Sequence, residues 1–161
     1  MAAMRERVLG RSGLRVSELC LGTMMFGEQT TEEEARRIVD HAADHGVNFI
    51  DTADVYADGR SEEITGRAIK AKRNHWIVAT KVGNVYRGGN AKGTGGLTRR
   101  WVHRAMDLSL ERLGLDHVDI YYMHRTDPDV DFDEVVAGFG DIIRAGKARY
   151  WGLSNIRGWQ I

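Results

Sequence analysis

Short apolar segments alternate with longer amphipathic segments along almost the whole chain. The apolar segments have the length of strands, and each of the first four is followed by a segment with helical periodicity. Strands that alternate with helices in this way predict a parallel sheet with right-handed crossovers. We therefore expect strands within residues 18–24, 47–53, 75–82, 118–124 and 148–155, and helices within residues 30–46, 61–73, 98–114 and 131–146.

The predicted helices carry signals at their ends. Thr31 and Glu34 form the pattern of a capping box, and Gly46 stands where a left-handed residue would end the helix. Ser61 is expected to cap the second helix, because a serine hydroxyl accepts a hydrogen bond from the first backbone N–H groups of a helix. The remaining predicted helix ends are Thr98, Gly114, Asp131 and Gly146. Ahead of the first strand, two extended runs around residues 10–13 predict a β-hairpin.

Two architectures fit this order of elements: a doubly wound open sheet and a (β/α)8 barrel. A dinucleotide-binding open sheet carries G-x-G-x-x-G after its first strand, whereas this chain has LGTMMFG (residues 21–27), which lacks that spacing. A complete TIM-type barrel typically needs about 250 residues. The chain has 161 residues, so we expect an incomplete barrel with about five of the eight strands. On this interpretation residues 1–161 form a single domain that is truncated on its C-terminal side.

The composition argues against several classes of function. The chain has 23 basic and 23 acidic residues. This balance argues against a protein that binds nucleic acids or membrane surfaces, because such proteins usually carry an excess of basic residues. Cys20 is the only cysteine, so we expect neither a disulfide framework nor a cysteine metal cluster. The sequence has no apolar segment as long as a membrane span, and its N-terminus lacks the apolar core of a signal peptide. We therefore expect a cytoplasmic protein.

Two patterns resemble ligand sites but have simpler interpretations. His41 and His45 stand four residues apart on a predicted helix, but no H-E-x-x-H glutamate or third ligand accompanies them, so we expect an exposed helix face and no metal. RGGNAKGTGG (residues 87–96) lacks G-x-x-x-x-G-K-[ST], so we expect a mobile loop rather than a phosphate site. We expect three tryptophan rings to pack in the core or between the helices and the sheet: Trp101, Trp151 and Trp159.

The predicted strands end in groups that can do chemistry. Parallel strands place their carboxyl ends on one side of a sheet, and in β/α barrels this side carries the active site. The groups that follow the strands are Gly22 and Thr23, Asp51 with Tyr56 in the loop behind it, Lys81, His124, and Ser154 with Asn155. An ammonium beside a phenol favours the phenolate and makes the phenol a better proton donor near neutral pH. Such a set could protonate a developing alkoxide, and reduction would require a nicotinamide cofactor to supply hydride.

Each of these groups also has a structural interpretation when it is taken alone. Lys81 could be an exposed strand end, and His124 could be a hydrogen-bonded core residue. Ser154 and Asn155 are both good helix caps. Asp54 is expected to be a turn carboxylate rather than a catalytic one. A catalytic role is favoured because the ionisable groups end successive strands, which brings them together in space.

Several segments of the chain resemble the aldo-keto reductase family, and together they cover nearly its whole length. They are LGTMMFG, FIDTADVYADGRSEE, VATKVG, LERLGLDHVDIYYMHR and YWGLSN. The most specific is the D-T-A-x-x-Y element (residues 51–56) ahead of a helix start. Residues 121–128 and 148–155 resemble the bacterial and potassium-channel β-subunit-like branch.

The resemblance implies a (β/α)8 barrel that uses NADPH to reduce an aldehyde or ketone to an alcohol, so the expected partner is a small-molecule carbonyl substrate. The implied catalytic residues are Asp51, Tyr56, Lys81 and His124. Tyr56 would be the general acid, Lys81 would be bonded to Asp51, and His124 would polarise the carbonyl. The implied cofactor-binding residues are Gly22, Thr23, Asp51, Ser154 and Asn155. The alternatives are a non-catalytic nicotinamide-binding or regulatory subunit and an inactive fragment.

Overall fold

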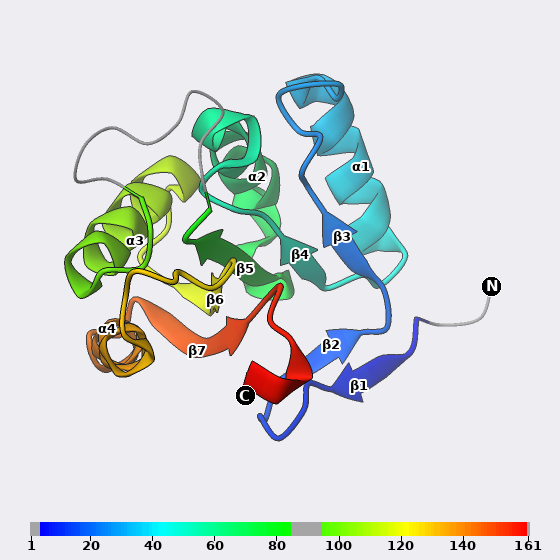
Figure 1. The fold of residues 1–161 in the computed structure, drawn as a ribbon. Helices are drawn as coiled ribbons and strands as arrows, with labels where there is room; N and C mark the ends of the chain where they lie inside the picture. Colours follow the sequence, from blue (N-terminus) through cyan, green and yellow to red (C-terminus); the bar gives the residue numbers. More distant parts are fainter. Residues whose placement is uncertain (1–3, 85–94, 161) are drawn as a thin grey trace.

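The computed structural model describes residues 4–84 and 95–160 of the chain. Five strands form a parallel sheet in the order β3-β4-β5-β6-β7, which is also their order along the chain (Figure 1). Their bounds are β3 (Cys20–Gly22), β4 (Phe49–Asp51), β5 (Ile77–Val82), β6 (Val118–Met123) and β7 (Ala148–Leu153). A doubly wound sheet reverses its strand order at a switch point. The unbroken order therefore favours the barrel-type architecture over the open sheet.

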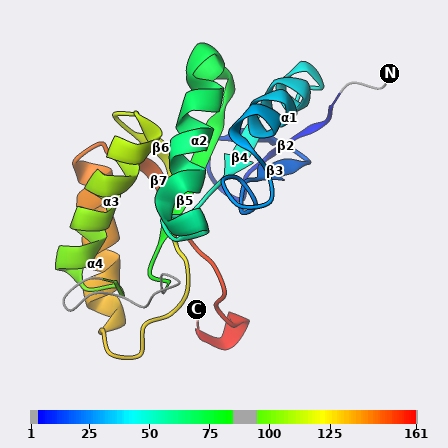
Figure 2. The same cartoon turned by 90° about the horizontal axis from the view of Figure 1, so that it is seen from above.

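The helices follow one side of the curved sheet (Figures 1 and 2). Within the described residues they are α1 (Glu32–Asp44), α2 (Arg60–Ile69), α3 (Arg99–Leu113) and α4 (Phe132–Arg144). Right-handed crossovers between consecutive strands place successive helices on the same face of a sheet. The described residues also form three 3₁₀ helices, η1 (Tyr56–Gly59), η2 (Lys70–His75) and η3 (Gly158–Gln160). A helix long and apolar enough to cross a membrane was not found among the described residues.

The apolar core lies between the sheet and the helices. Ile50 and Val78 are registered partners on β4 and β5, and both are fully buried. Tyr121 on β6 is also buried, and its ring lies 5.1 Å from the ring of Phe139 on α4. Because neighbouring side chains of a strand point to opposite faces, the residues next to these point away from the helices. One of them is Asp51, so the strand that fills the core also carries a candidate site residue.

The predicted hairpin is confirmed and lies at the amino end of the sheet. Strands β1 (Glu6–Val8) and β2 (Arg15–Ser17) pair antiparallel. The Ser17 N–H donates to Asn48 Oδ1 over 2.7 Å, and the Asn48 N–H donates to Ser17 Oγ over 3.1 Å. Asn48 directly precedes β4, so these bonds attach the hairpin to the end of the sheet opposite the carboxyl ends of its strands (Figure 1).

Most of the predicted helix ends are confirmed. Thr31 Oγ1 accepts the Glu34 N–H, and the Glu34 carboxylate accepts the Thr31 N–H, which completes the capping box. Side chains cap the N-termini of α3 and α4 from Thr98 and Asp131. The predicted stops all have positive φ, as a left-handed helix end requires: Gly46, Gly114 and Gly146.

Two predictions about individual residues are wrong. Ser61 does not cap α2, because the N-cap position is Gly59, with a φ of 93°, and Ser61 lies inside the helix with its side chain buried. Trp159 is not packed in the core but is 77% exposed; it belongs to η3, which lies apart from the four α-helices (Figure 2). Trp101 and Trp151 pack against the apolar core as predicted.

Candidate active site

The Lys81 ammonium joins two of the predicted site residues. Its Nζ lies 2.5 Å from Asp51 Oδ2 and 3.3 Å from the Tyr56 hydroxyl oxygen. Nζ also donates to the Thr52 carbonyl oxygen over 2.7 Å. An ammonium has three donors, and these three acceptors account for the stability of a charged side chain in a residue that is only 7% exposed. Lys81 therefore lies between Asp51 and Tyr56, as expected.

Tyr56 reaches Lys81 from a tight turn that follows β4. The turn begins with Asp54, at the position where a turn carboxylate was expected. The Asp54 side chain is buried. After Tyr56, the backbone is left-handed at Ala57 (φ 50°), Asp58 (φ 52°) and Gly59 (φ 93°). Residues other than glycine rarely adopt such values, and strained backbone of this kind gathers at functional sites. The turn leads directly into α2.

His124 follows β6 and completes the group. Its side chain is buried, and its ring lies edge-on to the ring of Tyr56 with 5.8 Å between the centroids. Burial and the positive charges of Lys81 and Arg125 lower the pKa of His124 from 6.5 to about 4. The imidazole is therefore neutral near pH 7, so that one ring nitrogen is a hydrogen-bond donor and the other an acceptor. We refer to Asp51, Tyr56, Lys81 and His124 as the tetrad.

The charges of Asp51 and Lys81 act on one another within the tetrad. Burial raises the pKa of Asp51, and the charge and hydrogen bond of Lys81 oppose that rise. The Asp51 carboxylate thus sits in a partly buried place where the ammonium stabilises its charged form. The same ammonium also contacts the Tyr56 hydroxyl oxygen.

Thr23, Thr52 and Ser61 form a buried hydroxyl cluster behind Asp51. Ser61 Oγ lies 2.9 Å from Thr23 Oγ1 and 3.1 Å from Thr52 Oγ1, and it donates to the Thr23 carbonyl oxygen over 2.8 Å. Thr23 Oγ1 donates to the Asp51 carbonyl oxygen over 3.1 Å. The cluster thus joins the carboxyl ends of β3 and β4 to the start of α2. The polar residues were visible in the sequence, but their contact was missed because it joins separate elements.

The other predicted cofactor residues lie at the carboxyl ends of the two outer strands. Gly22 is registered with Asp51, and a Cβ added to it would meet no described atom within 4 Å. Asn155 has a φ of 51°, and its Nδ2 donates to the His124 carbonyl oxygen over 2.8 Å and to Ser154 Oγ over 3.0 Å. The structure thus brings Ser154 and Asn155 beside His124. The Thr23 hydroxyl instead points into the buried cluster.

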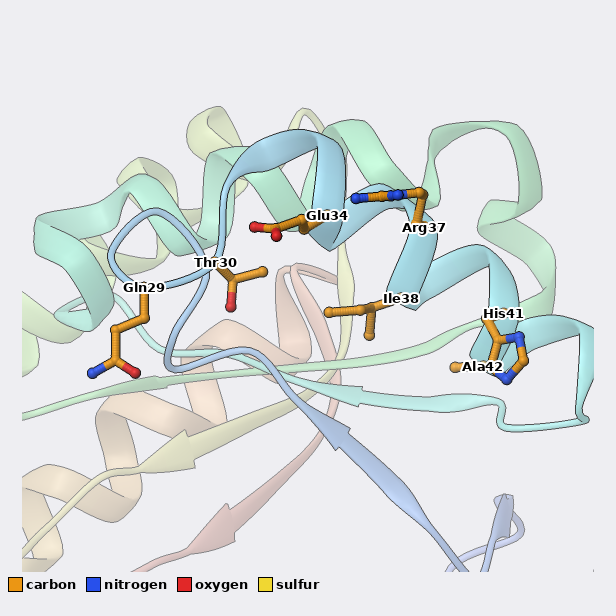
Figure 3. A pocket seen from close by; sticks show the side chains of 7 residues that line it. All are labelled: Gln29, Thr30, Glu34, Arg37, Ile38, His41 and Ala42. Carbon is orange, nitrogen blue, oxygen red and sulfur yellow. The ribbon is translucent and has the colours of Figure 1, made fainter.

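A pocket of about 650 Å³ lies along α1 and shares no residue with the tetrad (Figure 3). Its lining residues are Gln29, Thr30, Glu34, Arg37, Ile38, His41 and Ala42.

His41 and His45 are exposed, as predicted. Within residues 4–84 and 95–160, no group of three metal-ligating side chains was found. Residues 87–94 of the glycine-rich segment lie outside the described residues.

A singly wound parallel sheet with this tetrad at its carboxyl edge defines an α/β protein of the β/α-barrel type. The described strands and helices correspond to part of such a barrel. A model of the aldo/keto reductase family matches residues 18–161, and the chain belongs to that family.

Relatives of known sequence and structure agree with this assignment. A probable voltage-gated potassium channel subunit beta from Arabidopsis thaliana is 40% identical over 98% of this chain and 48% of its own length. The uncharacterized oxidoreductase YrpG from Bacillus subtilis is 39% identical over 98% of this chain and 51% of its own length. The solved structure of the aldo-keto reductase AKR11C1 from Bacillus halodurans (holo form) superposes on this chain with a TM-score of 0.86. The match has 40% sequence identity and covers 96% of this chain and 51% of that chain.

The chain spans about half the length of the curated relatives that it matches. Its fold is an incomplete (β/α)8 barrel, and its relatives include both a bacterial protein named as an uncharacterized oxidoreductase and a plant protein named as a probable potassium-channel subunit. The predicted fold, family and branch are therefore confirmed.

Proposed function

We propose that this chain carries the catalytic part of an NADPH-dependent reductase that converts an aldehyde or ketone to an alcohol. The observation that carries the proposal is the contact of Lys81 Nζ with both Asp51 Oδ2 and the Tyr56 hydroxyl. Membership of the aldo/keto reductase family and the oxidoreductase relative YrpG support oxidoreduction in general. The proposed enzyme is a cytoplasmic protein in which residues 1–161 belong to one domain, and its partner is a small-molecule carbonyl substrate.

The carboxyl edge of the sheet suits a nicotinamide cofactor. The open space at Gly22 allows a flat group to approach the backbone beside Asp51, and Ser154 and Asn155 offer a hydroxyl and an amide at the other end. We assign Ser154 and Asn155 to the nicotinamide amide, and Gly22, Thr23 and Asp51 to the ribose. Thr23 would act by holding Asp51, because its hydroxyl is buried. When bound, NADPH would supply the hydride.

In this scheme Tyr56 supplies the proton. When the carbonyl carbon is reduced, the electrons of the C=O π bond would move onto the oxygen, and the phenolic proton of Tyr56 would transfer to that oxygen to give the alcohol. Lys81 stabilises the phenolate that is left, and Asp51 holds Lys81 in place. Neutral His124 donates a hydrogen bond to the carbonyl oxygen and orients it. The phenolate then regains a proton from solvent.

The test is an assay of the purified chain with a panel of aldehydes and ketones. NADPH and NADH are compared by following the loss of their absorbance, and cofactor affinity is measured separately by fluorescence titration. Tyr56→Phe is expected to remove nearly all turnover and to leave cofactor affinity almost unchanged, because only the phenolic hydroxyl is lost. Full turnover by Tyr56→Phe would overturn the assigned mechanism.

A second candidate is a nicotinamide-binding subunit that regulates a partner protein. The 40% identity to a probable voltage-gated potassium channel subunit beta favours it. This candidate predicts saturable cofactor binding with no turnover across the carbonyl panel. A chain that is inactive alone would show neither binding nor turnover, so the same two measurements separate all three possibilities.

A further inference from the structure

A buried ion pair lies beside the turn that carries Tyr56. Glu62, in the first turn of α2, is fully buried, and its Oε2 accepts a hydrogen bond from Arg112 Nε on α3 over 2.6 Å. Its Oε1 accepts the Thr80 hydroxyl over 2.5 Å. Helices α2 and α3 lie side by side in both views (Figures 1 and 2). A carboxylate without solvent exposure persists only with such partners, so these contacts hold α2, α3 and β5 together at one point.

Arg112 also packs on the last residue of the turn. A Cβ built on Gly59 would lie 2.8 Å from Arg112 Cδ and 3.0 Å from Arg112 Nε. The arginine side chain therefore covers the Gly59 backbone at van der Waals distance, and Gly59 itself is buried. Because Glu62 holds the guanidinium, the ion pair restrains the place where the left-handed segment enters α2.

The same ion pair reaches the strand that carries Lys81. Thr80 immediately precedes Lys81 on β5, and its buried hydroxyl donates to Glu62. Side chains alternate along a strand, so Thr80 points toward the helices while Lys81 points toward the tetrad. Glu62 thus contacts the supporting structure of Lys81 directly and that of Tyr56 through Arg112 and Gly59.

The turn requires support because its backbone is strained. Ala57 and Asp58 are not glycines, yet their φ values are 50° and 52°. L-residues in this region are crowded, and strained conformations persist only where the surrounding structure over-determines them. Relaxation of either residue to a right-handed conformation would redirect Tyr56, which directly precedes them.

We propose that Glu62 and Arg112 are positioning residues whose ion pair keeps residues 57–59 left-handed and thereby sets the contact between Tyr56 and Lys81. They act through Gly59 and Thr80 rather than at the reacting atoms. The catalytic consequence of this role rests on the proposed function, whereas its structural consequence does not.

The structural test uses Glu62→Gln, which keeps the shape of the side chain and removes its charge. NMR chemical shifts of Ala57 and Asp58 report their backbone conformation, and nuclear Overhauser effects between the Tyr56 and His124 rings report the placement of the phenol. We expect the left-handed shifts and the ring-to-ring effects to be lost in Glu62→Gln. Adding Ala57→Gly and Asp58→Gly should restore the ring-to-ring effects, because glycine adopts the left-handed region freely. Unchanged spectra in Glu62→Gln would overturn the proposal.

The kinetic test measures kcat and KM on a carbonyl substrate that the parent chain reduces. Misplacement of a catalytic group costs up to about 100-fold in rate, so we expect Glu62→Gln to lower kcat by about 10- to 100-fold with little change in KM. The added glycines should recover part of this loss. A fall in kcat without any recovery would overturn the proposal, because the loss would then not arise from the backbone conformation of this turn.

The matched control is Glu32→Gln, which breaks the exposed pair of Glu32 and Arg67 between α1 and α2. It should leave kcat and the NMR spectra unchanged, and an effect as large as that of Glu62→Gln would overturn the proposal. Arg112→Lys serves if Glu62→Gln does not fold: it keeps the charge but loses the packing on Gly59, so kcat should still fall, and a parental value would overturn the proposal. If the parent chain shows no turnover, the proposed function fails while the NMR measurements still test the ion pair.

Discussion

Lys81 contacts Asp51 across neighbouring strands although the two residues are not paired in register. The registered partner of Asp51 on β5 is Ala79, and Lys81 stands two residues further along the same face. The lysine side chain therefore leans back along the strand to bring Nζ within 2.5 Å of Asp51 Oδ2. This geometry leaves the ammonium close to the loop after β4, where it also meets the Tyr56 hydroxyl. One cation thus couples the stability of the sheet edge to the placement of the phenol.

Removal of the Lys81 charge should destabilise the fold. The Asp51 and Lys81 side chains are 24% and 9% exposed, so Lys81→Met leaves a largely buried carboxylate without its counter-charge and should lower the free energy of unfolding by up to about 3 kcal/mol. Adding Asp51→Asn should recover part of this loss, because no unpaired charge is left behind. Urea denaturation of the parent, both single variants and the double variant measures the coupling. Strictly additive effects would contradict this account.

Acid should destabilise the protein through His124. The pKa of His124 is about 4 in the folded state and 6.5 ordinarily, so the unfolded chain takes up this proton first as the pH falls. The contribution of His124 is fully present above pH 6.5 and is lost between pH 6.5 and 4, by about 3 kcal/mol at most. The raised pKa of Asp51 acts in the opposite direction, and comparison of His124→Asn with the parent separates the two. Denaturation curves between pH 7.5 and 4 should therefore show a shallower decline for His124→Asn, and parallel declines would refute the assignment.

Gly66 should not tolerate a side chain. An added Cβ would lie 2.1 Å from the Leu113 carbonyl oxygen, which is backbone and cannot rotate away. Gly66→Ala should force α2 and α3 apart and cost about 1–3 kcal/mol of unfolding free energy. Gly140→Ala on α4 is the matched control, since the nearest atom there belongs to the flexible Arg144 guanidinium at 3.4 Å. The control should be neutral or stabilising by up to about 1 kcal/mol, so similar losses in thermal and urea unfolding would argue against close helix packing at Gly66.

Ser61→Ala should cost more than the loss of a helix cap. The substitution removes a partner from both threonine hydroxyls and from the Thr23 carbonyl oxygen inside the buried cluster. We expect the free energy of unfolding to fall by about 1–3 kcal/mol. The NMR chemical shifts of Thr23 and Thr52 should also move toward the values of an unfolded chain. Thr98→Ala removes an exposed cap of α3 and should cost about 1 kcal/mol with no change in those signals. Unaffected threonine signals in Ser61→Ala would contradict the proposed cluster.

The strands and helices could be predicted because their signals are local. Apolar periodicity, the Thr31–Glu34 capping box and the glycine at the end of α1 each depend on residues within a few positions of one another. The family resemblance rests on similarly short segments. The errors have the opposite character. Ser61 is of a residue type that commonly caps helices, but its side chain bonds to Thr23, which lies 38 residues away along the chain. No rule based on neighbouring residues detects such a partner.

The amino-acid sequence alone determined the order of the elements, the family and the identity of the candidate groups at the strand ends. Only the tertiary structure decided how these groups act on one another. The lowered pKa of His124 depends on burial and on the nearby charges of Lys81 and Arg125. The support of Tyr56 depends on Glu62 and Arg112, which are 50 residues apart along the chain. Backbone periodicity is set by neighbours in sequence, whereas the energy of a charge is set by everything that packs around it in space.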